Sequence, residues 1–255
     1  MNSIQEDKEK SRSATPLAER MRPKRLEEVR GQSHLLGEDC LLPKLIRENR
    51  VGNLILTGPP GTGKTTLATV IAEESECKLI KLNAVTSNVS ELRDCLKLAK
   101  YYGAEKCYLF VDEIHRFNKS QQDLLLPDIE SGEARLIGAT THNPRYYVND
   151  PLLSRSQLFT LQPLSVEETE TALIDCLKDQ DKGLAHRECT SEPKAINQIA
   201  RLAEGDLRKA YNILEVIVEG LSNEDAVSED AVALFARERS IRYDRDEDEH
   251  YDTAS

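Results

Sequence analysis

The chain has 255 residues, with 34 lysines and arginines against 45 aspartates and glutamates, so its formal net charge at pH 7 is −11. That length suits one large domain or two small ones. Charged residues make up 31% and hydrophobic residues 39%, a balance that excludes collagen, a disordered acidic chain and a disulfide-bonded miniprotein. Because the chain is acidic overall, a nucleic-acid partner would need a local basic path.

The order of the residues excludes two further classes of protein. No apolar run approaches about 18 residues, so the sequence predicts no membrane partner, and its first residues lack the apolar stretch of a secretory signal. The six cysteines are scattered without a CxxC pair, which indicates reduced thiols and not a zinc site or a disulfide framework. These patterns together predict a cytoplasmic protein.

Residues 16–162 have the pattern of an α/β domain, and residues 1–15 are expected to form a disordered polar tail. Short apolar runs alternate with helix-like segments, which favours a mostly parallel sheet covered on both faces. The runs are 54–56, 79–82, 108–111, 136–137 and 158–161. Between the second and third runs, apolar residues recur every three or four positions from Val89 to Ala99, which predicts a helix.

Residues 163–240 have helical patterns throughout and predict a small all-helical domain. Ser165 and Glu168 have the spacing of a capping box, which marks the start of a helix. Further helices are expected at 194–203, 207–218 and 229–237. The final stretch, 241–255, is acidic and is interpreted as a solvated linker.

A glycine-rich octapeptide between a predicted strand and a predicted helix fits the phosphate-binding pattern G-x-x-x-x-G-K-[ST]. Its backbone N–H groups are expected to surround the β- and γ-phosphates of ATP, with Lys64 as a positive charge and the Thr65 hydroxyl as a ligand of Mg²⁺. The alternative is a simple turn into an ordinary helix. The predicted nucleotide contacts here are Gly58, Pro59, Pro60, Gly61, Thr62, Gly63, Lys64, Thr65 and Thr66.

Two carboxylates follow the apolar run 108–111. Asp112 is expected to hold Mg²⁺ through water, and Glu113 is expected to orient and polarise the attacking water as the catalytic base. The alternative is a strand that ends in solvated acids. With the phosphate loop, these residues predict that the chain binds and hydrolyses a nucleoside triphosphate.

Four stretches, at 16–23, 31–37, 112–123 and 138–144, resemble the replication-associated recombination protein A family. This family is the bacterial relative of the Werner-helicase-interacting ATPase, in the clamp-loader branch of AAA+ proteins. The resemblance covers about residues 16–255. It implies a P-loop AAA+ core with a mostly parallel five-stranded sheet followed by a helical lid. It also implies a DNA-dependent ATPase that uses ATP and Mg²⁺ at stalled or damaged replication forks, in recombination and repair.

The resemblance implies roles for residues outside the two motifs. Arg22, Pro23, Gly31 and Gln32 resemble the box that contacts adenine, with a surface loop as the alternative. Thr141 resembles the sensor-1 residue that reads the γ-phosphate.

Asn143 is a rival to Thr141 for the sensor-1 role, and either residue could instead close a turn. The chain departs from the family pattern in the same loop, at His142 and at Arg145–Tyr146.

Two arginines are implied to reach phosphates from outside the loop. Ser154–Ser156 resembles the Ser-Arg-Cys of the clamp-loader branch, with serine in place of the cysteine, so Arg155 resembles an arginine finger that acts on the ATP of a neighbouring subunit. Arg208, at the start of the predicted helix 207–218, resembles sensor 2. The alternative for Arg208 is a solvated side chain.

The expected partners are DNA, as single strands, forks or duplex ends, and replication proteins, which would place the chain at the nucleoid. For contact with phosphates, residues 115–122 offer Arg116, Lys119, the amide side chains and the backbone amides of a helix start, with Asn118 as its predicted cap. The alternative is a capped surface helix. Asn83 is a candidate restraint on Glu113.

The family continues past Ser255 into a helical oligomerisation domain, so the sequence is interpreted as the ATPase core alone. The family assembly is oligomeric, and self-association of this chain by itself is therefore in doubt. Three other functions are left open: a clamp-loader subunit, a branch-migration motor, and a scaffold that binds ATP with little hydrolysis.

Overall fold

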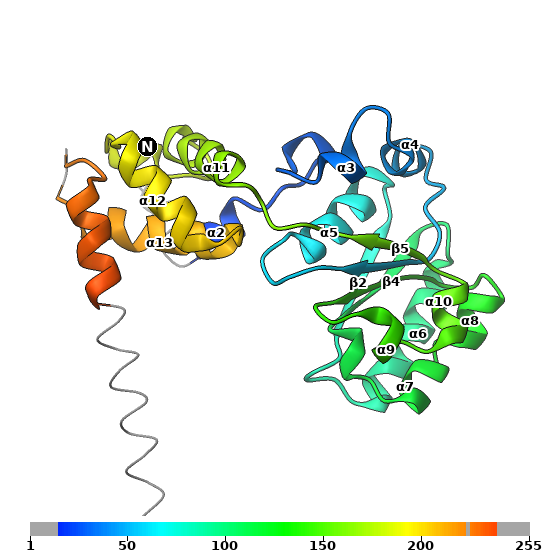
Figure 1. Cartoon of the computed structure of the whole chain (residues 1–255). Helices are drawn as coiled ribbons and strands as arrows, with labels where there is room; N and C mark the ends of the chain where they lie inside the picture. The colour runs from blue at the N-terminus through cyan, green and yellow to red at the C-terminus, as the bar shows by residue number, and fades with distance from the viewer. Residues whose placement is uncertain (1–14, 223–224, 239–255) are drawn as a thin grey trace, which may run out of the picture. The chain divides into compact units, whose positions relative to one another are not determined.

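The structure, a computed structural model, describes residues 15–222 and 225–238, and it separates into two compact units (Figure 1). An α/β unit comprises residues 23–163. A helical unit comprises the described residues up to Arg22 and those from Leu164 onward. The predicted polar tail up to residue 14 and the predicted acidic stretch 241–255 lie outside the described residues. In the described residues, no helix has the length and apolar character needed to cross a membrane.

The α/β unit is built on five parallel strands in the order β2-β3-β4-β1-β5. The strands are β1 (Leu54–Thr57), β2 (Lys78–Asn83), β3 (Cys107–Asp112), β4 (Arg135–Thr140) and β5 (Gln157–Thr160). The predicted five-stranded α/β fold is thus confirmed. β4 extends furthest beyond its predicted apolar run, because backbone pairing with β1 and β3 continues past the run.

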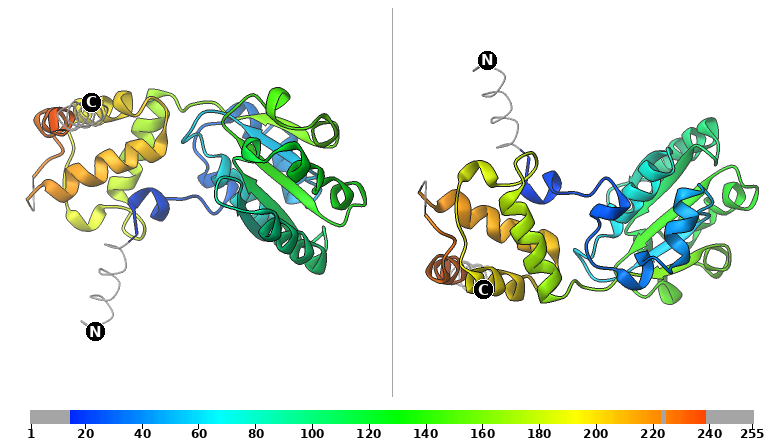
Figure 2. Two further views of the ribbon diagram at one scale, coloured as in Figure 1. Left: turned by 90° about the horizontal axis from the view of Figure 1, so that it is seen from below. Right: turned by 90° about the horizontal axis from the view of Figure 1, so that it is seen from above.

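Side chains alternate between the two faces of the sheet, as the period of a strand requires. Leu54, Leu56 and Phe110 pack on one face in a core shared with α4 (Leu41–Arg47) and α5 (Lys64–Glu74). Ile55, Leu109 and Val111 pack on the other face in a core shared with α6 (Val89–Tyr102). Figure 2 shows the helices on both sides of the sheet. Both faces of the central strands β1, β3 and β4 are buried, so these strands are largely apolar, whereas the edge strands β2 and β5 carry exposed residues.

Local signals set the ends of α6. Asn88 accepts hydrogen bonds from the amides of Ser90 and Glu91 in a capping box, and Gly103 follows the helix with φ +82°. The predicted helix is confirmed and continues to Tyr102. The other short elements of this unit are η1 (Leu26–Glu28), α3 (Ser33–Leu36), η2 (Ile114–Arg116), α7 (Lys119–Asp123), α8 (Leu126–Glu130), α9 (Pro144–Tyr147) and α10 (Asp150–Ser154).

The helical unit has one apolar core of its own, formed by amphipathic helices. Its elements are α2 (Leu17–Arg20), α11 (Val166–Lys178), η3 (Ala185–Arg187), α12 (Pro193–Ala203) and α13 (Leu207–Gly220), and residues 229–238 are also helical. The expected capping box at the start of α11 is present, with Ser165 accepting from the amide of Glu168 at 3.1 Å.

The segment before the α/β unit differs from the sequence-based division, which placed residues from 16 onward with the sheet. Leu17 is fully buried in the core of the helical unit, and its backbone N–H donates to Glu215 Oε1 at 2.8 Å. Arg20 forms an ion pair with the same carboxylate at 3.1 Å. These contacts attach α2 to α13, so the helical unit is formed by chain segments that precede and follow the α/β unit in sequence.

Candidate nucleotide-binding and catalytic site

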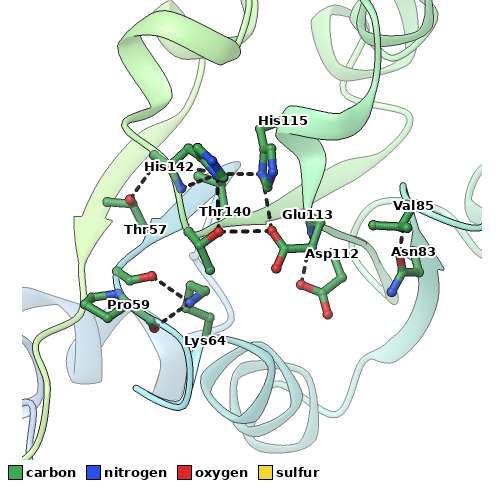
Figure 3. Close-up of polar contacts among 12 residues, drawn as sticks. Thr57, Pro59, Lys64, Asn83, Val85, Asp112, Glu113, His115, Thr140 and His142 are labelled. Carbon is green, nitrogen blue, oxygen red and sulfur yellow. Dashed lines mark hydrogen bonds and ion pairs between the residues drawn. The ribbon is translucent and has the colours of Figure 1, made fainter. Parts of the chain in front are cut away.

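The loop of residues 58–65 joins β1 to α5 at the carboxyl edge of the sheet (Figure 3). Gly58 and Gly63 have φ of +150° and +96°, and a Cβ on Gly58 would lie 2.4 Å from the carbonyl oxygen of Leu161. Only glycine fits such a close backbone approach. The loop therefore turns tightly into α5, whose first N–H groups have no partner within the helix and favour an anion.

Lys64 brings a positive charge to this loop. Lys64 is only 7% exposed, and its Nζ donates to the carbonyl oxygens of Gly58 and Pro59 at 2.7 and 2.8 Å. Thr65 and Thr66 follow in the first turn of α5. A lysine and a helix start at one loop make the local potential positive, which suits phosphate groups.

Gln32 fastens this loop to the segment after β5. Its Nε2 donates to the carbonyl oxygen of Gln162 at 2.7 Å and approaches that of Thr62 at 3.4 Å, while Oε1 accepts from Gln162 N at 2.9 Å. The predicted contact of Gln32 with adenine stays a prediction, since its amide group bonds to the backbone here. Gly31 precedes it with φ +66°.

Of the other two predicted adenine-side residues, Arg22 lies in the helical unit, where it forms an ion pair with Glu19, and Pro23 begins the α/β unit. Their predicted roles also stay predictions.

Asp112 and Glu113 stand at the end of β3. Glu113 adopts the left-handed conformation, with φ +52°, and its N–H donates to Asp112 Oδ1 at 3.0 Å. This backbone turn lets two consecutive carboxylates lie on the same side of the strand end (Figure 3). Such conformations are uncommon outside glycine and often occur at functional sites.

The donors at this edge fit Mg²⁺. The Asp112 carboxylate and the Thr65 hydroxyl are hard oxygen ligands, and Mg²⁺ takes few protein ligands beside phosphates and water. In the described part of the chain, no group of three or more histidines, cysteines and acidic residues is placed to hold a metal ion.

A hydrogen-bonded cluster joins Glu113 to the end of β4. His115 Nδ1 lies 3.2 Å from Glu113 Oε2 and 3.0 Å from Thr140 Oγ1. The hydroxyl of Thr141 donates to the same Glu113 oxygen at 3.5 Å. The structure thus brings Thr141 to Glu113. Asn143, its rival, instead caps α9 by accepting from the amide of Arg145 at 3.1 Å.

His115 is buried within this cluster. Its side chain is 6% exposed, and its ring lies 4.1 Å from the ring of His142, centroid to centroid, with Tyr147 beside both. Burial, and then the neighbouring His142, lower the pKa of His115, against the opposing effect of the Glu113 carboxylate. His115 is the first residue of the segment expected to contact DNA, but the turn after Glu113 directs its ring into the site.

Asn83, the predicted restraint on Glu113, and Arg155, the predicted contact of a γ-phosphate, each bond to other residues in this structure. Asn83 Oδ1 accepts from the amide of Val85 at 2.8 Å and so caps its own turn, and its predicted restraint of Glu113 stays a prediction. Arg155 follows α10, pairs with Glu130 at 2.8 Å and has a side chain that is 41% exposed. An exposed arginine is compatible with action on a second subunit, and that role stays a prediction.

Arg208 lies in the first turn of α13, in the helical unit, and is exposed. Its predicted role as sensor 2 is also a prediction only.

The segment after His115 forms two short helices. Asn118 and Gln121 make the expected capping box of α7, and Arg116 and Lys119 are exposed. Pro127 lies in the first turn of α8, after a break that follows Asp123.

Gln122 is one of the amide side chains expected to contact phosphates, but it is only 1% exposed, and its structural role was not foreseen. It donates to the carbonyl oxygens of Phe117 and Tyr147 at 2.9 and 2.8 Å and accepts from the amide of Asn149 at 2.8 Å. It therefore fixes α7 to the loop after β4. A buried glutamine on a five-residue helix leaves no periodic signal that would have revealed it.

Comparison with known proteins gives two family matches. Residues 54–164 match the ATPase family associated with various cellular activities (AAA), and residues 185–255 match the AAA C-terminal domain. Among solved structures, RuvB, the Holliday junction branch migration motor of Thermotoga maritima, is similar with a TM-score of 0.69 and 26% identity. The likeness covers 84% of this chain and 71% of that one.

Curated relatives are more similar in sequence. Replication-associated recombination protein A of Escherichia coli K12 is 41% identical over 246 residues, which cover 94% of this chain and 55% of the relative. ATPase WRNIP1 of Dictyostelium discoideum is 41% identical over 223 residues, which cover 86% of this chain and 25% of the relative. The chain thus spans about half the length of the bacterial relative. It belongs to the replication-associated recombination protein A family of AAA+ proteins.

Proposed function

We propose that this chain binds ATP with Mg²⁺ at the carboxyl edge of its sheet and hydrolyses it. The observation that carries the proposal is the meeting, at one edge, of the glycine loop with Lys64 and the strand end with Asp112 and Glu113 (Figure 3). Phosphate binding and water activation need these two groups together.

The proposed role of each residue follows from its chemical group. The N–H groups of the loop and the Lys64 ammonium bind and orient the phosphates, while Asp112 and Thr65 would hold the metal. Mg²⁺, when bound with ATP, neutralises charge on the phosphate oxygens. Glu113 Oε2 is engaged by His115 and Thr141, and among the described residues Oε1 accepts no hydrogen bond. Oε1 is therefore the atom that would accept the proton of the attacking water.

Arg155 and Arg208 are proposed to complete the site. Arg155 would stabilise charge on the γ-phosphate of a neighbouring subunit's ATP, as its exposure allows, and Arg208 would reach the phosphates of its own subunit. A monomer would then bind ATP and hydrolyse it slowly, because the transition state lacks the neighbour's arginine.

At the level of the cell, we propose that the ATPase is DNA-dependent and serves replication-associated recombination and repair, probing single strands, forks or duplex ends beside replication proteins. The names of the relatives support this role. On this chain, exposed Arg116 and Lys119 follow the catalytic carboxylate directly and offer phosphate contacts without reading bases.

The test is steady-state ATP turnover per chain across a range of protein concentrations, with and without forked DNA. We expect turnover to rise with concentration and again with DNA. The double variant Arg116→Ala/Lys119→Ala should lose most of the DNA stimulation and keep basal turnover, whereas Lys97→Ala, an exposed lysine of α6, should behave as the wild type. Tight ATP binding with no turnover under any condition would contradict hydrolysis and favour the nucleotide-binding scaffold.

The trans role of Arg155 has a separate test by mixing. Lys64→Ala and Arg155→Ala chains should each be inactive alone. Mixed, they should regain activity at interfaces that join an intact Lys64 to a neighbour's intact Arg155. No recovery in mixtures that do form oligomers would contradict an arginine acting between subunits.

A further inference from the structure

The contacts around Glu113 point to a residue that the phosphate-loop motifs do not include. We propose that His115 is a positioning residue for the catalytic base: its Nδ1–H holds Glu113 Oε2, so that Oε1 faces the attacking water. This inference rests on the proposed ATP hydrolysis. It assigns to His115 and His142 a function in the same site.

The hydrogen-bond partners of the ring select its tautomer. In the described residues, Nε2 of His115 is buried and has no hydrogen-bond partner, whereas Nδ1 meets Glu113 Oε2 and Thr140 Oγ1. A proton on Nε2 would be a buried donor without an acceptor, and a bare Nδ1 would face a carboxylate. A proton on Nδ1 avoids both costs, so the neutral Nδ1–H form is the one that fits.

The ring is itself held from two sides. Thr140 is fully buried at the end of β4, and its Oγ1 also accepts from the amide of His142 at 3.0 Å. The His142 ring lies against the His115 ring, and the carbonyl oxygen of His142 accepts from Thr57 Oγ1 at 3.2 Å. Strand ends β1, β3 and β4 are thereby tied to one imidazole, which fixes its direction toward Glu113 (Figure 3).

Glu113 needs the hydrogen bond from His115 to keep its carboxylate in one orientation. Its backbone is in the left-handed region at the start of a turn, and its side chain is 29% exposed, so the backbone and packing alone leave the carboxylate rotatable. A general base must lie within hydrogen-bond reach of its water, and misplacement by about 1 Å costs up to about 100-fold in rate. His115 supplies the missing constraint without touching the substrate.

Three substitutions separate positioning from core filling. Asparagine places an amide N–H where Nδ1 stands, glutamine places one nearer Nε2, and alanine places none. We expect His115→Asn to keep kcat within about 3-fold, and His115→Gln and His115→Ala to lower kcat by about 10- to 100-fold with KM for ATP unchanged. His142→Ala, which removes the stacked ring and the contact of its Nδ1 with Thr141 Oγ1 at 3.2 Å but leaves the His115–Glu113 contact, should lower kcat by less.

The contact itself is measured by ¹⁵N NMR of histidine-labelled chain, with the His115 signal identified by its loss in His115→Asn. A protonated Nδ1 that responds to Glu113→Gln is expected. A protonated Nε2, or His115→Ala with wild-type kcat, would overturn the proposal, as would His115→Asn no better than His115→Ala. If the wild type hydrolyses no ATP, the proposed function fails, and the NMR result then decides the His115–Glu113 contact alone.

Discussion

Polar side chains gather, mostly half-buried, at both edges of the central sheet, but their contacts differ between the two edges. At the amino edge, Arg135 lies over the ring of Tyr108 with its guanidinium carbon 4.1 Å from the ring centroid, and it donates to Asn49 Oδ1 at 2.9 Å and to Cys77 Sγ at 3.1 Å. At the carboxyl edge, Lys64 sits in a glycine loop and Glu113 in a left-handed turn. Polar groups that bond mainly to one another stabilise a fold. Polar groups held in strained turns, with an oxygen left to react, indicate a site.

Asp112→Asn at the carboxyl edge is the variant with the largest expected effect on the difference between the two edges. Asparagine keeps the oxygen that accepts from the Glu113 amide, so thermal stability should change little. It removes the negative charge that would hold Mg²⁺, so turnover should fall about 100-fold or more. The measurement is ATP turnover against Mg²⁺ concentration. Undiminished turnover would remove Asp112 from the site.

Arg135→Ala is the matching change at the amino edge. It removes several charge-assisted contacts and the stacking on Tyr108, so we expect a loss of about 3 kcal/mol of unfolding free energy. ATP affinity should stay unchanged. Chemical denaturation checks the first result and a nucleotide-binding titration the second, with exposed Arg145→Ala as the control. Weakened ATP binding in a stably folded Arg135→Ala chain would erase the distinction between the edges.

Tyr108→Phe also tests the contribution of the amino edge to stability, with a smaller expected effect. The phenol donates to the carbonyl oxygen of Val51 at 3.0 Å, and Arg135 also donates to this oxygen at 3.3 Å. The acceptor stays paired in the variant, so we expect a loss of about 1 kcal/mol of stability, seen as a lower denaturation midpoint. A loss as large as that of Arg135→Ala would mean that the two side chains act as one unit.

The smallest expected effect is a pH dependence from His115. Its pKa is lowered in the folded chain, so below the ordinary histidine pKa the unfolded chain binds a proton that the folded chain resists. Stability should therefore fall as the pH drops below about 6.5, and less so in His115→Asn. Denaturation midpoints of both chains across pH 5 to 7.5 test it. Identical slopes would show that His115 does not contribute.

The sequence predicted the α/β fold well because the central strands β1, β3 and β4 are buried on both faces and are therefore largely apolar. The phosphate loop and the Asp112–Glu113 pair were also visible, since each depends on residues adjacent in the chain. Their proposed roles stay predictions until they are tested by substitution.

The features that the sequence did not predict depend on where side chains point once the chain has turned. His115 looked like part of a polar surface helix, and only the left-handed backbone of Glu113 brings its ring to Thr140. Likewise, α2 is too short for a periodic pattern, so nothing in residues 16–22 indicated that Leu17 belongs to the helical core.

The central claim is that Glu113 activates water for ATP hydrolysis at the carboxyl edge. The most direct measurement compares wild type and Glu113→Gln for ATP binding and for hydrolysis at saturating ATP, with exposed Glu105→Gln as the matched control. We predict equal ATP affinity in all three chains and hydrolysis at least about 100-fold slower in Glu113→Gln alone. Hydrolysis by Glu113→Gln at the wild-type rate would contradict the account.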